Sequence, residues 1–139
     1  MKYVGLDVGD NRIGVAVSDS GLIANAVGNI DRLGYDFEAD IQKTVDKITE
    51  LGAEEIVVGL PKNMNGTIGP RAQTVMEFAD ALKEKIKLPI HFWDDRLTTV
   101  EAHKMMIDAG MRRDKRKKNV DRIAAVLILQ GFLDYRNKA

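Results

Sequence analysis

The sequence contains no cysteine, so the chain can form neither a disulfide nor a thiolate metal site, and it suits a reducing compartment. Its two histidines, His91 and His103, lack the spacing of metal ligands, and we expect both to be structural. No apolar run approaches the ~18 residues that a membrane span requires. The first ten residues, MKYVGLDVGD, have too short an apolar run for a signal peptide. These absences predict a cytoplasmic protein without a membrane-spanning segment.

The chain also has no excess charge of either sign, with 21 basic and 21 acidic residues among its 139. A protein that binds nucleic acid over its whole surface is usually basic. The charges are unevenly distributed, however. Residues 112–118 (RRDKRKK) contain six basic side chains and one acid, whereas residues 31–55 contain eight acids and three bases. The length fits one domain over residues 1–139, and the balanced total hides a local basic segment.

Apolar periodicity predicts a mixture of strands and helices. Residues 3–8 and 12–19 are typical of a strand hairpin, and residues 22–30 of a third strand. An antiparallel hairpin followed by alternating strands and helices predicts an α/β fold with a mixed sheet. After the third strand we expect a helix over 36–51, ended by Gly52, and a strand over 55–61. A helix from Pro70 to about residue 87 and a strand over 88–95 follow. A capping box at Thr98 and Glu101 starts a helix through Ala109, and a basic linker then leads to a last helix over about 120–135.

Acidic residues fall where these strands are expected to end. In an open α/β sheet, ligands bind beyond the carboxyl ends of the parallel strands. Asp7 ends the first strand, and Asp94 and Asp95 end the last one. Asp121 lies in the first turn of the last helix, on the same face as apolar residues, where an unpaired carboxylate is costly. Each acid also has a simpler explanation, because first-turn acids complement the helix dipole and strand-end acids suit tight turns.

A cluster of carboxylates requires a cation or protons, because like charges held close together repel. Oxygen ligands without cysteine favour Mg²⁺ or Mn²⁺ over Zn²⁺. Two such ions about 4 Å apart can hold the attacking and leaving oxygens of a phosphodiester. We therefore expect metal ligands among Asp7, Asp94, Asp95 and Asp121.

Basic and amide side chains are expected near the same edge of the sheet. Arg12 lies in a glycine-rich turn whose N–H groups can approach an anion. The basic segment leads into Asp121, which favours contact with a nucleic-acid backbone, although charge runs are more often a solvated face. The residues that we expect to bind nucleic acid are Arg12, Lys62, Asn63, Arg96, Arg112, Arg113, Lys115, Arg116, Lys117 and Lys118.

Four motifs in order resemble the YqgF/RuvX family: LDVGDNRIGVAVSD, GLPKNMNGTIGPRA, WDDRLTT and KNVDRIAAVLILQGFLD. This family is described both as Holliday-junction-resolvase-like and as nucleases of precursor 16S rRNA. The resemblance implies an RNase H-like fold, with a five-stranded mixed sheet flanked by helices, and divalent-metal hydrolysis. It also implies a cytoplasmic bacterial nuclease that matures the 5′ end of 16S rRNA. The acids of the family pattern fall on Asp7 and Asp121, and Lys117 fits it too. With Asp95 at the position of the family's third acid, the resemblance implies catalytic roles for Asp7, Asp95 and Asp121.

One position departs from the family, which usually has glutamate where this chain has Asp95. In the RNase H-like strand order, the last strand lies two strands, or roughly 10 Å, from the first. A glutamate reaches one methylene further than an aspartate. Asp94 points to the opposite side of the strand unless the chain has already turned. The resemblance therefore leaves open which of Asp94 and Asp95 completes the metal site.

Three functions are compatible with these observations. The first is a metal-dependent nuclease acting on precursor 16S rRNA or on branched DNA. The second is a non-catalytic module that binds RNA or the ribosome. The third is an actin-like ATPase or sugar kinase, because LDVGDNRIG resembles the phosphate loop of those enzymes. Those enzymes, however, hold nucleotide between two such domains. The sequence does not decide between monomer and homodimer, and a junction resolvase would need a two-fold dimer.

Overall fold

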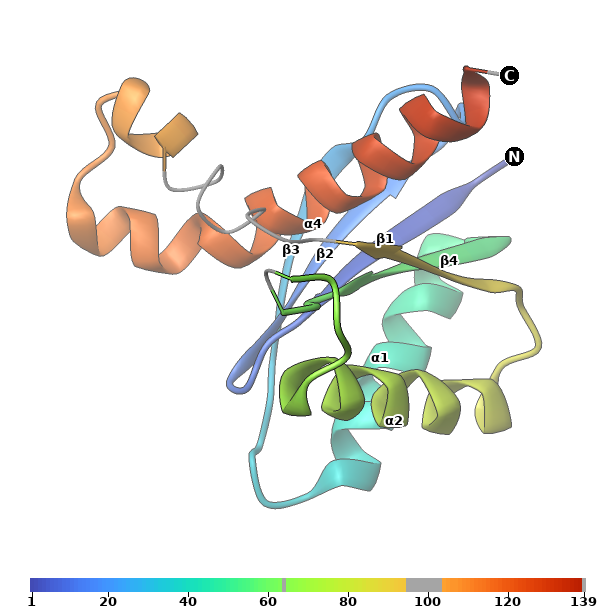
Figure 1. The fold of residues 1–139 in the computed structure, drawn as a ribbon. Helices are drawn as coiled ribbons and strands as arrows, with labels where there is room; N and C mark the ends of the chain where they lie inside the picture. The colour runs from blue at the N-terminus through green and yellow to red at the C-terminus, as the bar shows by residue number, and fades with distance from the viewer. Residues whose placement is uncertain (64, 95–103, 139) are drawn as a thin grey trace.

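The computed structural model describes residues 1–63, 65–94 and 104–138, apart from the side chains of residues 116–118. Residues 104–108 form a short helical segment before the last helix. The named elements, in chain order, are β1 (Tyr3–Val8), β2 (Arg12–Ser18), β3 (Asn25–Asp31), α1 (Phe37–Leu51), β4 (Glu55–Leu60), α2 (Pro70–Lys85), β5 (Ile90–Asp94) and α4 (Arg113–Asn137) (Figure 1).

The five strands form one mixed sheet with the order β3-β2-β1-β4-β5. β1 and β2 pair antiparallel, as do β2 and β3, whereas β4 pairs parallel to both β1 and β5. All six residues of β4 are buried, as expected for an interior strand with both faces covered. The predicted mixed sheet, with antiparallel hairpins first and parallel strands after them, is therefore confirmed.

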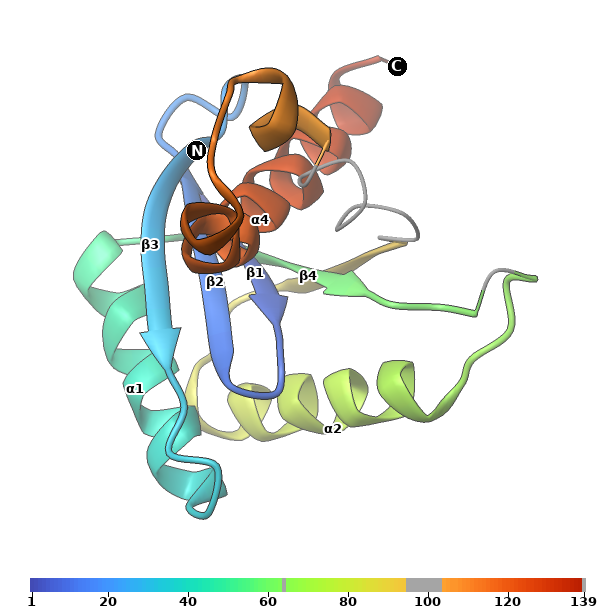
Figure 2. The ribbon, with the colours of Figure 1, turned by 90° about the vertical axis from the view of Figure 1, so that its left-hand side faces the viewer.

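Helices cover both faces of the sheet. Figures 1 and 2 show α1 and α2 against one face and α4 against the other. Val4, Leu6 and Ile13 belong to the apolar core on the α1 and α2 side. Tyr3 and Leu129 belong to a second core beneath α4. Because side chains alternate along a strand, β1 contributes to both cores.

α4 crosses all five strands and lies very close to the first two. A Cβ added to Gly5 of β1 would lie 2.7 Å from the Cβ of Leu129 on α4. A Cβ added to Gly14 of β2 would overlap the backbone carbonyl of Asp121. The glycines of the first motif therefore let a helix rest directly on the strand backbones.

α1 has the ends that its sequence predicts. The Asp36 side chain caps the helix by accepting a hydrogen bond of 3.1 Å from the Ala39 N–H. Gly52 ends it in the left-handed conformation, with φ of 70°. At the next helix, Pro70 occupies the first turn as predicted.

The expectation of a basic linker before the last helix is wrong. α4 begins at Arg113, so most of the basic segment is helical rather than a connection. Lysine and arginine are good helix formers, and the segment contains no glycine or proline. The break comes earlier, at Gly110, which has φ of 76°. The predicted capping box at Thr98 and Glu101 lies outside the described residues.

The third strand is also shorter at its start than predicted, because it begins at Asn25 rather than at Leu22. Gly21 turns the chain just before it, with φ of 80°. Among the helices that the structure describes, none is long and apolar enough to cross a bilayer.

Candidate active site

Asp7 is the penultimate residue of β1 and is half-buried. Its partner across the antiparallel ladder is Gly14 of β2. The strand therefore holds Asp7 close to the turn between β1 and β2, which Gly9 closes by donating its N–H to the Arg12 carbonyl at 3.0 Å. This places a carboxylate at the carboxyl end of β1, as the sequence predicts.

Asp121 reaches the same place from the opposite end of the chain. The tight contact between Gly14 and the Asp121 backbone sets α4 beside the Asp7 position of the sheet. Since α4 begins eight residues earlier, at Arg113, Asp121 lies in the third turn and not in the first. The dipole explanation therefore does not apply, because the effect falls off within the first turn.

Asp7 and Asp121 line one pocket of about 320 Å³, which we call the Asp7–Asp121 pocket. Its walls come from the end of β1, the following turn, the start of α2 and the third turn of α4. Three carboxylates and two guanidinium groups face this space. The residues that line it are Asp7, Gly9, Asp10, Asn11, Arg12, Arg71 and Asp121.

Arg12 and Asp121 form an ion pair in this pocket. Nε of Arg12 donates to Oδ2 of Asp121 at 3.1 Å, and the Asp121 side chain is 20% exposed. Burial raises the pKa of Asp121 above its ordinary value, and the neighbouring Arg12 guanidinium opposes that rise without cancelling it. A desolvated carboxylate of this kind gains from a nearby cation.

Arg71, which no sequence motif singles out, lines the pocket from the first turn of α2. Within the described part of the chain, its side chain makes no hydrogen bond or ion pair, so it is available to an anionic ligand. An arginine after a helix-starting proline looks like an ordinary surface residue in a sequence. The fold brings the start of α2 close to the β1–β2 turn, so that Arg71 and the turn residues line the same pocket.

Apart from Arg12, none of the predicted binding residues whose side chains the structure describes lines the pocket. Lys62 and Asn63 lie in the loop after β4, where the Asn63 amide donates to the Thr67 hydroxyl at 3.0 Å and so closes the loop. Arg112, Arg113 and Lys115 are exposed at the start of α4, while the side chains of Arg116, Lys117 and Lys118 are among those not described. The loop and the start of α4 both remain predicted binding sites.

Asp94 ends β5, two strands from β1, and is not among the described residues that line the Asp7–Asp121 pocket. Asp95 and Arg96 lie outside the described residues. The strand order gives the two-strand separation that the sequence analysis anticipated. Which of the two acids completes the site therefore stays a prediction.

The donor set of the pocket fits a hard divalent cation. Among the described residues, no group of three or more acidic or histidine side chains forms a complete metal site. Mg²⁺, however, is usually held by one or two protein carboxylates, with water and substrate phosphates filling the remaining positions. Asp7 and Asp121 match that requirement. Because Asp121 is partly buried, a bound cation would also stabilise its ionised form.

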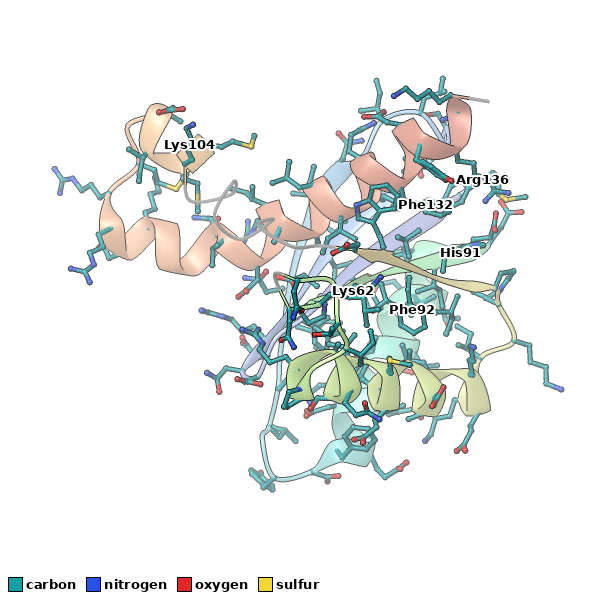
Figure 3. The ribbon with its side chains drawn as sticks, in the orientation of Figure 1. Lys62, His91, Phe92, Lys104, Phe132 and Arg136 are labelled. Atoms are coloured by element: carbon teal, nitrogen blue, oxygen red, sulfur yellow. The ribbon has the colours of Figure 1, made fainter. Side chains whose placement is uncertain are left out.

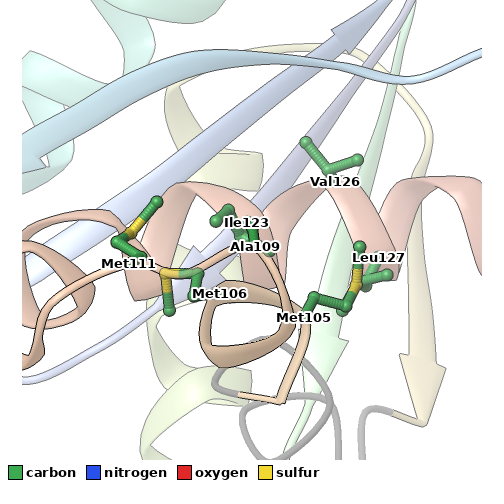
Figure 4. A pocket seen from close by; sticks show the side chains of 7 residues that line it. All are labelled: Met105, Met106, Ala109, Met111, Ile123, Val126 and Leu127. Carbon is green, nitrogen blue, oxygen red and sulfur yellow. The ribbon is translucent and has the colours of Figure 1, made fainter.

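A second cavity, of about 280 Å³, lies between residues 105–111 and α4 (Figure 4). Methionines line one side of it, and apolar residues of α4 line the other: Met105, Met106 and Met111 against Ile123, Val126 and Leu127. The described residues that line it include no titratable side chain, so they offer nothing for phosphodiester chemistry.

His91 has a structural setting, as expected from its sequence context, whereas His103 lies outside the described residues. Nε2 of His91 lies 2.7 Å from Oε1 of Glu55, and the Arg136 guanidinium donates to the same oxygen at 3.2 Å. Figure 3 shows His91, Phe132 and Arg136 grouped near the end of α4. Glu55 pairs with Tyr3 at the start of the parallel β1–β4 ladder, so this cluster lies at the opposite end of the sheet from Asp7.

Comparison with known proteins shows which family this chain matches. A family model described as "RuvX: Holliday junction resolvase" matches residues 1–135. A relative from Clostridium tetani, named "Putative pre-16S rRNA nuclease", is 52% identical over 96% of both chains. Relatives with the same name are 50% identical in Clostridium novyi (96% of this chain, 98% of the relative) and 48% identical in Clostridium botulinum strain Hall (99% and 100%).

Solved structures resemble the fold. Thermus thermophilus RuvC in complex with a Holliday junction substrate has a TM-score of 0.61 and 12% identity, covering 99% of this chain and 96% of that one. A second Thermus thermophilus RuvC structure has a TM-score of 0.57 and 13% identity, with coverage of 99% and 97%. At such identity the likeness concerns the RNase H-like fold alone. With a family model matched from residue 1 to residue 135 and relatives about half identical over nearly their whole length, the chain belongs to the RuvX family.

Proposed function

We propose that this protein is a metal-dependent nuclease that hydrolyses phosphodiester bonds of structured RNA, with precursor 16S rRNA as its substrate. The observation that carries the proposal is the pocket in which Asp7 of β1 and Asp121 of α4 meet beside two arginines. A pair of carboxylates with flanking guanidinium groups suits a phosphate and the cation that accompanies it. The names of the half-identical relatives support the same activity.

The choice of RNA over branched DNA rests on the degree of similarity. The relatives named for precursor 16S rRNA are 48–52% identical over almost the whole chain. The matching family model is described as a Holliday junction resolvase, but the solved protein that is bound to a junction is only 12% identical. Specificity depends on the detailed groups of a site rather than on its fold, so the closer relatives carry more weight.

Asp7 and Asp121 are the residues that we assign to Mg²⁺ or Mn²⁺, with Asp94 or Asp95 as a further ligand. A divalent ion bound there would polarise a phosphoryl oxygen and lower the pKa of water, and a two-ion arrangement would suit both the attacking and leaving oxygens. The rigid ladder of β1 holds the Asp7 backbone, and the close contact at Gly14 holds that of Asp121.

The arginines are assigned to the substrate phosphate. Arg71 has no partner among the described residues, so its guanidinium can donate hydrogen bonds to non-bridging phosphate oxygens. Arg12 pairs with Asp121 and can turn part of its donor fork toward the same phosphate. The exposed Arg112, Arg113 and Lys115 at the start of α4 extend the positive charge along the flanking backbone.

A non-catalytic RNA-binding module is the second candidate. The ion pair between Arg12 and Asp121 favours it, because an internal cation already neutralises one of the two carboxylates. Such a module would bind precursor rRNA without added metal, and neutralising Asp7 would leave its affinity unchanged.

Cleavage of a 5′-labelled precursor 16S rRNA fragment and of a Holliday junction, each with and without Mn²⁺, tests the proposal. We expect metal-dependent cleavage of the RNA. Asp7→Asn and Asp121→Asn should each lower the rate by more than about 100-fold, because loss of even an outer partner of a metal ligand costs about 10- to 100-fold. Asp80→Asn, at an exposed carboxylate on α2, is the control and should retain full activity.

Three results would decide against the proposal. Equal cleavage by wild type and Asp7→Asn would assign the activity to a contaminant. Preferential cleavage of the junction would replace RNA with branched DNA as the substrate. Metal-independent RNA binding without cleavage, unchanged in Asp7→Asn, would establish the binding module instead.

A further inference from the structure

Arg32 holds the β1–β2 turn through two of its backbone carbonyls, although it lies outside the Asp7–Asp121 pocket. Its Nη1 donates to the Gly9 carbonyl at 2.8 Å, and its backbone N–H donates to the Asn11 carbonyl at 2.9 Å. Gly9, Asn11 and Arg12 all line the pocket. One residue at the end of β3 thus fixes two carbonyls of the turn that forms one wall of the site.

A buried ion pair in turn fixes Arg32. Nε of Arg32 donates to Oδ2 of Asp40 at 3.1 Å, and the two side chains are 13% and 2% exposed. Oδ1 of Asp40 accepts the Leu33 N–H at 2.9 Å. Burial acts to raise the pKa of Asp40, but the hydrogen bonds from Leu33 and Arg32 outweigh it and hold the pKa below its usual value. Asp40 is therefore a fixed anion on α1.

The geometry of the guanidinium explains why this position suits arginine. Nε serves Asp40 while Nη1 serves Gly9, and the group stacks over the Phe78 ring, 5.3 Å from its centroid. The planar fork of arginine holds two acceptors in set directions, which the single ammonium group of lysine cannot do. The contacts form a continuous chain from α1, through Asp40 and Arg32, to the turn that carries Arg12.

We propose that Arg32 and Asp40 are a positioning pair, which sets the β1–β2 turn so that the Arg12 guanidinium meets Asp121 and the substrate phosphate in one geometry. The effect of this pair on catalysis rests on the proposed nuclease function. Its effect on the order of the turn is independent of that function. Neither residue touches the pocket itself, so both act through the backbone of Gly9 and Asn11.

A purely structural ion pair would have different consequences, and the chain offers a matched control. Arg136 pairs with the buried Glu55 at 3.2 Å and stacks over the Tyr3 ring at 5.5 Å. It shares two contacts with Arg32, a buried carboxylate and an aromatic ring, but lies at the other end of the sheet and bonds no carbonyl of the β1–β2 turn. Arg136→Gln should therefore destabilise the fold as Arg32→Gln does, without reaching the site.

Amide hydrogen exchange tests the turn directly and requires no activity. In Arg32→Gln and Asp40→Asn, we expect the Gly9 N–H, which bonds the Arg12 carbonyl, to exchange at least tenfold faster than in wild type. Arg136→Gln should leave that rate within twofold. Equal protection of Gly9 in all the variants would overturn the proposal. Arg32→Lys, which keeps the charge, serves in place of Arg32→Gln if that variant does not fold.

Steady-state cleavage of the precursor rRNA fragment tests the catalytic consequence, at a temperature where every variant is folded. We expect Arg32→Gln to lower kcat about 10- to 100-fold with KM changed less than threefold, the usual range for partners of site residues. Arg32→Lys should recover part of that loss, and Arg136→Gln should match wild type. Equal losses in Arg32→Gln and Arg136→Gln would reduce the pair to a structural role. An inactive wild type would refute the nuclease function, while the exchange rates would still decide whether the pair orders the turn.

Discussion

Nε of Arg12 and Oδ2 of Asp121 lie 3.1 Å apart, although 109 residues separate them in the chain. The ion pair joins the turn after β1 to the third turn of α4, and it neutralises a carboxylate that burial would otherwise penalise. It also places one guanidinium beside the proposed metal ligands. The affinity of the site for a cation therefore depends on how strongly Arg12 competes with that cation for the Asp121 carboxylate.

The first prediction concerns the pH dependence of metal binding. The pKa of Asp121 is raised mainly by burial, and Arg12 partly opposes the rise. Because a ligand carboxylate must be ionised, Mn²⁺ affinity should fall on acidification with a midpoint above the ordinary aspartate value of about 3.9. Arg12→Gln removes the opposing charge and should move that midpoint to higher pH.

Calorimetric titration of Mn²⁺ across a pH series measures this midpoint. Asp80→Asn, distant from the pocket, should reproduce the wild-type curve. A midpoint that moves to lower pH in Arg12→Gln would contradict the electrostatic account of Asp121.

The second prediction is that Arg71→Ala impairs the reaction without affecting stability. Arg71 has no partner among the described residues, so its removal should leave the melting temperature unchanged. A hydrogen bond to a charged group is worth about 1.5–3 kcal/mol, so kcat/KM should fall by roughly tenfold or more. Lys83→Ala, which removes an exposed basic residue from the other end of α2, should change neither quantity. An unaltered kcat/KM in Arg71→Ala would remove Arg71 from the site.

The third prediction concerns the contact between β2 and α4. In Gly14→Ala, the new methyl group would overlap the Asp121 carbonyl, so α4 must move away from the sheet. We expect the free energy of unfolding to fall by about 1–3 kcal/mol, as in other overpacked cores, and Mn²⁺ affinity to fall with it. Urea denaturation measures the first effect, and Asn25→Ala, exposed on β3, is the reference. Wild-type values for Gly14→Ala would mean that α4 does not rest on β2 at this point.

The fourth prediction is acid sensitivity of the fold at the end of the sheet remote from the pocket. Burial acts to raise the pKa of Glu55, but the hydrogen bonds from His91 and Arg136 outweigh it and hold the pKa below its usual value. A carboxyl group with a depressed folded-state pKa stabilises the protein above its unfolded-state pKa of about 4.3, and that stability is lost as pH falls toward the folded value. Glu55→Gln should therefore show a flatter dependence of melting temperature on pH below about 4.5.

Thermal unfolding followed from pH 7 to pH 3 measures this slope. Asp46→Asn, at an exposed position on α1, should keep the wild-type slope. Identical slopes for wild type and Glu55→Gln would show that the cluster adds no pH-dependent stability.

Much of the fold could be predicted because its signals are local. The alternating apolar residues of β2, the four- and three-residue spacing in α1, and Gly52 at its end each act through neighbouring backbone. The start of α4 could not be predicted in this way. A run of lysine and arginine reads equally well as a solvated linker or as the first turns of a helix, and the choice depends on what precedes and supports it.

At the site, the local sequence is enough to show which carboxylates are out of place, because a charge on an apolar strand or helix face is costly wherever the chain folds. That argument identifies Asp121, while Asp7 is identified by its place at the carboxyl end of an apolar strand. Three features of the site follow only from the three-dimensional packing: Arg12 pairs with Asp121, Arg71 lines the pocket, and Arg32 holds the turn. Those contacts join residues from different elements, and their energies depend on distances that local sequence does not encode.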